Sequence, residues 1–221
     1  MEVLSGFGDQ LLRWLRPVHR KLRQRKVELF LRLMVDASAG DTLLDVGGGP
    51  GIDGEFLDLY SNFSWVVVVN LNAQKFKTSK GIRLKIVGAD GCSLPFKSKS
   101  FDWVFSNAVI EHVGGWVRQK QFADEIRRVS AKGYFVATPN KNFPVEPHTL
   151  LPFYQFLAPK QQRRIVRLSP GYMREPLQVN LLSHSDLSRL FPEARVHKTG
   201  LRAFPNSIVA TYRAHKLYDR I

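Results

Sequence analysis

Leu43-Leu44-Asp45-Val46-Gly47-Gly48-Gly49-Pro50-Gly51 is the strongest structural signal in the chain. An apolar run leads directly into a glycine-rich turn, and residues 54–60 after the turn have a helical pattern. Glycine allows a tight backbone turn and the close approach of a ligand, and the first N–H groups of a helix have no partner within it. We therefore predict a buried strand, a ligand-binding turn and a helix, with Asp45 facing a cationic group of the ligand.

The rest of the chain alternates apolar runs with helical patterns, which indicates an α/β fold with a parallel sheet. Further strands are expected at 65–69, 82–87, 101–105 and 133–138. The last two candidates, 195–199 and 207–212, are joined by a short loop and are expected to pair antiparallel. Before them, the capping box of Ser183 and Asp186 predicts a short helix over 187–191.

The length of 221 residues fits one domain with an appendage. We assign residues 1–39 to a basic amphipathic helix and residues 40–215 to the domain. Residues 143–180 are rich in proline and aromatic side chains and are predicted to form a long structured insertion. A single cysteine excludes an internal disulfide, and no apolar run reaches the roughly 18 residues of a membrane span. We expect a cytoplasmic protein.

The charge points to an anionic partner. Lysine and arginine number 33 against 19 acidic residues, a net charge of +14. A nucleic acid, an anionic lipid or a phosphorylated substrate would each be attracted by this charge. A basic surface that only aids solubility would also account for it. The helix expected over residues 9–35 carries eight basic side chains and an apolar stripe that includes Leu29 and Leu33. It can pack on the domain, or hold the protein peripherally on an anionic membrane surface.

Two kinds of cofactor fit the glycine turn. Gly49, Gly51 and Gly54 satisfy the Gly-x-Gly-x-x-Gly spacing of a dinucleotide site. Such a site also requires an acid about 20 residues later, where this chain has Asn70 and Asn72. The turn alone leaves both possibilities open.

A longer sequence pattern distinguishes between these two kinds of cofactor. The spacing Asp45-x-Gly47-x-Gly49-x-Gly51 resembles motif I of the class I S-adenosylmethionine-dependent methyltransferases. Residues 88–96 (GADGCSLPF), 100–107 (SFDWVFSN) and 110–113 (IEHV) look like the signature of the branch that includes the ubiquinone- and menaquinone-biosynthesis methyltransferases. The resemblance covers residues 40–140. It implies a Rossmann-like three-layer sandwich with a seven-stranded sheet, S-adenosyl-L-methionine as cofactor, and methyl transfer.

The resemblance also implies which residues bind the cofactor. The glycines would pass under its methionine and ribose, Asp45 would hold its ammonium group, and Asp90 would accept a hydrogen bond from its adenine. An amide at position 70 cannot accept symmetrically from both ribose hydroxyls, so we expect weaker binding or compensation from Asn72. The expected set is Asp45, Gly47, Gly49, Gly51, Asn70, Asp90, Gly91 and Asn107.

Candidate catalytic residues follow the fourth and fifth strands, since ligands of open α/β sheets bind at the carboxyl ends of strands. His112 could act as a general base near neutral pH, or it could cap a helix. Glu146 and His148 lie on a proline-stiffened loop that enters the insertion, and we expect the insertion to cover the substrate. In the ubiquinone branch, a Glu-His pair is associated with a divalent metal together with a further acid three residues before the Glu. Ala108 stands there, so we expect no metal.

For the acceptor, the signature and the aromatic insertion favour a small or lipid-like molecule. The charge of +14 favours RNA or protein instead, but the Asn-Pro-Pro-aromatic motif of base methylation is absent after the fourth strand. A non-catalytic methyltransferase-fold protein that binds an anionic partner is a third possibility, and a nicotinamide oxidoreductase is a distant fourth.

Overall fold

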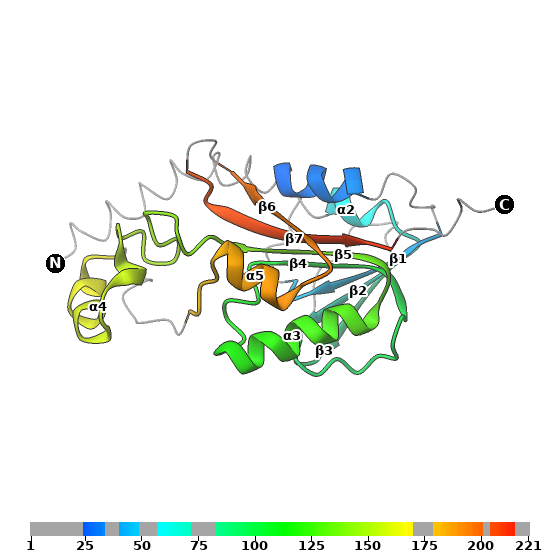
Figure 1. Ribbon diagram of the computed structural model, residues 1–221. Helices are drawn as coiled ribbons and strands as arrows, with labels where there is room; N and C mark the ends of the chain where they lie inside the picture. Colours follow the sequence, from blue (N-terminus) through cyan, green and yellow to red (C-terminus); the bar gives the residue numbers. More distant parts are fainter. Residues whose placement is uncertain are drawn as a thin grey trace.

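The computed structural model describes residues 24–33, 40–48, 57–71, 83–169, 179–200 and 204–214. At its centre is a seven-stranded sheet in the order β3-β2-β1-β4-β5-β7-β6 (Figure 1). The strands are β1 (Thr42–Val46), β2 (Trp65–Asn70), β3 (Leu84–Gly88), β4 (Phe101–Asn107), β5 (Ser130–Pro139), β6 (Arg195–Thr199) and β7 (Ser207–Arg213). β1 to β5 pair in parallel, and β7 is antiparallel to both β5 and β6. The predicted mostly parallel sheet with a C-terminal antiparallel hairpin is confirmed.

Helices cover both faces of this sheet (Figure 1). Helix α3 (Trp116–Val129) and helix α5 (His184–Leu190) lie on one face, whereas α2 (Leu57–Tyr60) and a helix over residues 24–33 lie on the other. This three-layer arrangement explains the unbroken apolar run of β2: Val67 and Val69 pack with the α3 side, and Val66 and Val68 with the opposite side. A strand covered on both faces needs apolar side chains at successive positions.

The helix over 24–33 belongs to the core of the sheet. Phe30 is 1% exposed, and its ring lies 5.2 Å from that of Phe105 and 5.4 Å from that of Phe135. Val27 is buried in the same cluster, which Leu29 and Leu33 join only partly buried. The charged side chains of Arg25, Glu28 and Arg32 are exposed. In this part, therefore, the helix packs its apolar side on the domain; residues 1–23 and 34–39 lie outside the described residues.

Helix α5 begins earlier than the sequence pattern predicted. The hydroxyl of Ser183 accepts a hydrogen bond from the backbone N–H of Asp186, and the Asp186 carboxylate accepts one from the N–H of Ser183. The expected capping box therefore forms. However, the first helical residue comes directly after the cap, so the helix spans His184–Leu190 and not 187–191.

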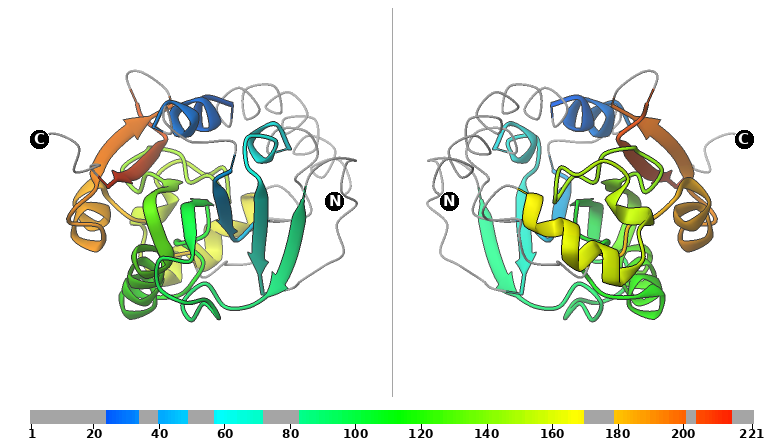
Figure 2. Two further views of the ribbon diagram at one scale, coloured as in Figure 1. Left: turned by 90° about the vertical axis from the view of Figure 1, so that its right-hand side faces the viewer. Right: turned by 90° about the vertical axis from the view of Figure 1, so that its left-hand side faces the viewer.

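The insertion that follows β5 contains, in its described residues 143–169, three short elements, η1 (Tyr154–Phe156), α4 (Pro159–Ile165) and η2 (Val166–Leu168); residues 170–178 lie outside the described residues. They lie beyond the carboxyl end of β5, and α4 faces the viewer in the right-hand view of Figure 2. The Gln162 amide donates to the carbonyl of Tyr154 at 3.1 Å and so ties α4 to η1. None of the described helices is both long and apolar enough to span a membrane.

Candidate active site

A cavity of about 290 Å³ opens at the carboxyl ends of β1, β2 and β4. We call it the glycine cleft, because Gly47 and Gly91 form part of its wall. The carboxyl edge of a parallel sheet is the place where α/β folds bind ligands. Other residues that line the cleft include Asn70, Asp90, Val109, His112 and Arg118.

Gly47 shows why the turn requires glycine. Its φ is +90°, and its N–H donates to the carbonyl of Val69 at 2.7 Å. A Cβ at this position would lie 2.2 Å from a methyl carbon of Val109. Any side chain would therefore be strained in its backbone and would collide with the loop after β4. Gly49 and Gly51, two further members of the expected cofactor set, lie outside the described residues.

Asp45 is buried at the end of β1, where it accepts a hydrogen bond of 2.5 Å from the hydroxyl of Tyr60. Its carboxylate lies under the glycine turn, since a Cβ on Gly48 would come within 2.9 Å of Oδ2. Burial raises the pKa of Asp45 to about 7, although the hydrogen bond from Tyr60 acts in the opposite direction. The charge of this side chain therefore changes near neutral pH.

Asn70 takes part in shaping the turn. Its side-chain amide donates to the carbonyl of Gly48 at 2.7 Å. A carboxylate at position 70 could not make this bond, because it has no proton to donate. The amide thus connects the end of β2 to the glycine turn while it lines the cleft. Asn72, expected to compensate for it, lies outside the described residues.

Asp90 is held by a residue that the sequence analysis did not single out. The guanidinium of Arg118, from the first turns of α3, donates to Oδ2 of Asp90 at 2.5 Å. The N–H of Cys92 donates to Oδ1 at 2.9 Å. The hydrogen bond from Arg118 is the main reason that the pKa of Asp90 is lowered. Gly91 lies against α3, since a Cβ there would come within 2.7 Å of the Phe122 ring.

Asn107, at the end of β4, is joined to the helix over 24–33. The ammonium group of Lys26 donates to Oδ1 of Asn107 at 3.0 Å. Just beyond this contact, Ala108 has a left-handed backbone with φ +58°. Residues other than glycine with such a backbone are enriched at functional sites.

The three expected catalytic side chains come together in one chain of contacts. Nε2 of His112 lies 3.2 Å from Nε2 of His148, and Nδ1 of His148 lies 2.6 Å from Oε1 of Glu146. Oε2 of Glu146 accepts from the backbone N–H groups of His148 and Thr149. Burial raises the pKa of Glu146, but its hydrogen bonds from His148 and Thr149 outweigh this and leave the pKa lowered. Glu146 is therefore an ionised acceptor that fixes the orientation of the His148 ring.

Beside them, Glu111 is fully buried. Its Oε2 accepts from the Thr138 hydroxyl at 2.9 Å, whereas its Oε1 has no hydrogen-bond partner among the described residues. Oε1 lies 3.9 Å from Nε2 of His112. Burial raises the pKa of Glu111, and both burial and the neighbouring His148 lower the pKa of His112. His112 is consequently neutral at pH 7 and able to accept a proton.

The same side chains could also bind a cation. One ligand atom from each of Glu111, His112 and His148 lies within 4.8 Å of the others. A carboxylate with two imidazoles suits a divalent transition metal, and the unpartnered Oε1 of Glu111 fits such a role. The absence of a metal, expected because Ala108 replaces an acid, stays a prediction.

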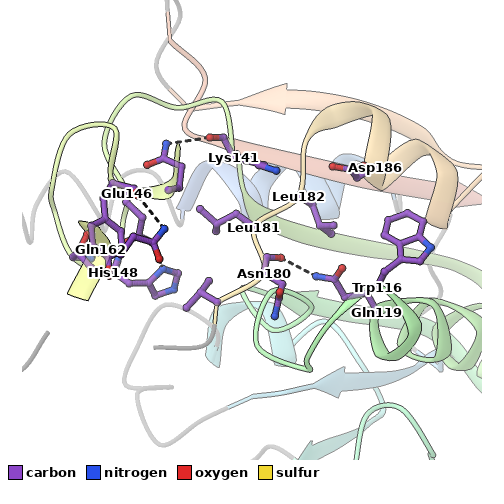
Figure 3. Close-up of a pocket in the computed structure, with 14 residues that line it drawn as sticks. Trp116, Gln119, Lys141, Glu146, His148, Gln162, Asn180, Leu181, Leu182 and Asp186 are labelled. Carbon is purple, nitrogen blue, oxygen red and sulfur yellow. Dashed lines mark hydrogen bonds and ion pairs between the residues drawn. The ribbon is translucent and has the colours of Figure 1, made fainter. Parts of the chain in front are cut away.

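A second cavity, of about 360 Å³, lies under the insertion (Figure 3). We call it the insertion cavity. Figure 3 shows Glu146 and His148 at one end and Trp116 and Gln119 at the other. His148 lines this cavity and His112 lines the glycine cleft. Each cavity is therefore bordered by one member of the histidine pair.

Comparison with known proteins agrees with this geometry. Residues 44–137 match a family model described as a methyltransferase domain. No match was found among curated proteins.

Many solved structures share the fold. The N-methyltransferase NodS from Bradyrhizobium japonicum WM9, in complex with S-adenosyl-L-homocysteine, superposes with a TM-score of 0.56 at 13% identity over 88% of this chain and 87% of NodS. Magnesium protoporphyrin IX methyltransferase from Synechocystis PCC 6803, with bound S-adenosylmethionine, superposes with a TM-score of 0.55 at 13% identity. The match covers 89% of this chain and 80% of the Synechocystis chain. A protein from Methanosarcina mazei described as a SAM-dependent methyltransferase superposes with a TM-score of 0.54 at 16% identity. The match covers 83% of this chain and 97% of the Methanosarcina chain.

The family match supports a methyltransferase, and the similar structures support its fold, which in two of them holds S-adenosyl-L-homocysteine or S-adenosylmethionine. Residues 44–137 thus match a methyltransferase domain model, within a chain that has the fold seen in S-adenosylmethionine-dependent methyltransferases.

Proposed function

We propose that this protein transfers a methyl group from S-adenosylmethionine in the glycine cleft to a small-molecule acceptor in the insertion cavity. The proposal rests on the contact between His112, which lines the glycine cleft, and His148, which lines the insertion cavity. A volume of about 360 Å³ suits a small molecule. Lys141 and Asp186 add charged groups to a wall that also contains Trp116 and Tyr154.

In this proposal the glycine cleft, lined by Asn70, Asp90 and Gly91, orients the cofactor, and Asp45 lies buried beneath the glycine turn. S-adenosylmethionine supplies an activated methyl group. The protein therefore has to align the acceptor atom and remove its proton where it carries one. The acceptor's lone pair forms the new bond to the methyl carbon as the carbon–sulfur bond breaks.

We propose that the histidine pair receives the proton removed from the acceptor atom. Because Nδ1 of His148 bonds to the ionised Glu146, its N–H points there and its Nε2 is an acceptor toward His112. A proton taken up at Nδ1 of neutral His112 can pass from Nε2 of His112 to His148. The imidazolium formed on His148 then faces the Glu146 carboxylate. His112 and His148 are thus the base, and Glu146 is the group that positions and stabilises it.

The acceptor class can be tested by labelling. The purified protein is incubated with methyl-labelled S-adenosylmethionine and, separately, with a polar metabolite extract, a lipid extract, RNA and protein. Label in a metabolite or lipid product, lost in the His148→Ala variant, supports the proposal. Label in RNA or protein alone would contradict it and favour the alternative suggested by the net charge of +14.

A further inference from the structure

The outer surface of the insertion carries a row of basic side chains. Lys160, Arg163, Arg164 and Arg167 follow one another at helical positions i, i+3, i+4 and i+7 along α4 and η2, and all four are exposed. This spacing places them on one face of the helix. No acidic residue occurs between positions 147 and 169. We call this row, with the apolar residues described next, the insertion surface.

Large apolar side chains are exposed on the same short segment. Phe153 is 60% exposed, Phe156 is 54% exposed and Leu168 is 77% exposed. Phe153 also has a left-handed backbone, with φ +57°. Its N–H donates to the carbonyl of Pro144 at 2.7 Å, which holds the strained residue in place. Folding therefore keeps an aromatic side chain in water at a cost in backbone strain.

The inner side of this segment is fixed by contacts. Tyr154 and Val166 are buried, and the Gln155 amide donates to the carbonyls of Lys141 and Phe143 at 3.1 and 2.6 Å. Tyr154, Gln155 and Gln162 line the insertion cavity. The basic and apolar side chains named above consequently have little freedom to turn inward. The segment from Phe153 to Leu168 thus lines the insertion cavity on its inner side, and its cationic and apolar side chains are exposed to solvent.

We propose that the insertion surface docks on an anionic lipid bilayer. Its cations would contact lipid phosphates, while Phe153, Phe156 and Leu168 would enter the interfacial region. Basic side chains beside exposed aromatic and aliphatic ones are the combination that binds such an interface. A polynucleotide would match the cations but would leave Leu168 without an apolar environment, so the combination favours lipid.

This placement differs from the one that the sequence suggested, in which the N-terminal helix contacts the membrane. In residues 24–33 the apolar side chains Val27 and Phe30 are buried in the domain core and are not free to enter lipid. The insertion surface has exposed apolar side chains and cations together. The inference does not depend on the proposed methyl transfer, because it rests on this surface alone.

The test is co-sedimentation of the full chain with vesicles of phosphatidylcholine, with and without phosphatidylglycerol. We expect binding only to the anionic vesicles. Arg163→Glu with Arg164→Glu should weaken it roughly tenfold or more, because each basic side chain near an anionic surface contributes substantially to binding. The matched control is Arg83→Glu with Lys85→Glu, which changes the net charge equally at β3, where both side chains are exposed. Thermal unfolding of each variant verifies its fold.

Two further variants identify the apolar contribution. Phe153→Ser with Phe156→Ser should weaken vesicle binding, and fluorescence of a Phe153→Trp variant should be quenched by brominated lipids. The proposal is overturned if the charge variant binds vesicles as well as the control does, or if the unchanged protein fails to bind anionic vesicles. Binding to RNA that depends on Arg163 and Arg164, without vesicle binding, would identify a polynucleotide surface instead.

Discussion

Tyr60 donates a hydrogen bond of 2.5 Å to Asp45 directly beneath the glycine turn. Both side chains are buried, so the carboxylate has this hydroxyl in place of water. Burial raises the pKa of Asp45 to about 7. A residue assigned to the ammonium group of the cofactor therefore gains and loses its charge in the physiological pH range.

Cofactor binding should depend on this titration. Below about pH 7 Asp45 is protonated and cannot attract a cation, so the affinity for S-adenosylmethionine should fall as the pH is lowered. Calorimetric titration one pH unit on either side of 7 measures the effect. An Asp45→Asn variant should bind more weakly with little pH dependence over this range. If the variant kept the pH dependence of the unchanged protein, Asp45 would not be its source.

The same group should affect stability with a definite sign. Its pKa is about 7 in the folded protein against an ordinary value of 3.8, so the folded state binds more protons between these values. Its contribution to the free energy of unfolding therefore falls as the pH rises through this window. The difference corresponds to at most about 4 kcal/mol.

Asp45→Asn, which keeps an acceptor for Tyr60, should consequently raise the melting temperature at pH 8. Below pH 3, where Asp45 is mostly protonated in both states, the variant and the unchanged protein should melt at similar temperatures. Thermal unfolding followed by circular dichroism at both pH values provides the measurement. Equal melting temperatures at pH 8 would mean that the buried carboxylate carries no such penalty.

The histidine pair should behave as one catalytic unit. Replacing His112 or His148 by alanine should lower kcat by roughly 10²- to 10⁴-fold, the usual contribution of a general base. The double variant should lose little more, since groups that act together are not additive. Glu146→Gln should lower kcat less and shift its pH profile, because the proton on His148 loses its carboxylate partner. Losses that multiply in the double variant would show that the two histidines act separately.

The helix over 24–33 should be required for stability. Phe30→Ala removes a ring that contacts four aromatic side chains, namely Phe63, Trp103, Phe105 and Phe135. We expect a loss of about 3–5 kcal/mol in the free energy of unfolding. Glu28→Ala, on the exposed side of the same helix, should change it by less than about 0.5 kcal/mol. Denaturant unfolding compares the two variants, and equal effects would contradict the packing described.

The sequence predicted the sheet because its signals are local. Apolar runs mark most of the strands, glycine or proline ends β1, β3 and β5, and the short connection between the last two strands favours antiparallel pairing. The glycine turn was predictable for the same reason, since a local backbone with φ +90° at Gly47 favours glycine.

Contacts between distant segments could not be predicted in this way. His112 and His148 were each candidates, but their contact joins two loops that are 36 residues apart. The ion pair of Arg118 with Asp90 and the bond of Lys26 to Asn107 depend on how two helices pack on the sheet. No spacing rule in the sequence marks such pairs, because helix packing brings them together.

Calorimetric titration of the purified protein with S-adenosylmethionine, with NAD as the control ligand, measures whether the glycine cleft binds this cofactor. We predict saturable binding of S-adenosylmethionine, competition by S-adenosylhomocysteine, and no binding of NAD. Binding of NAD alone, or failure of the folded protein to bind S-adenosylmethionine at pH 8, would contradict the account.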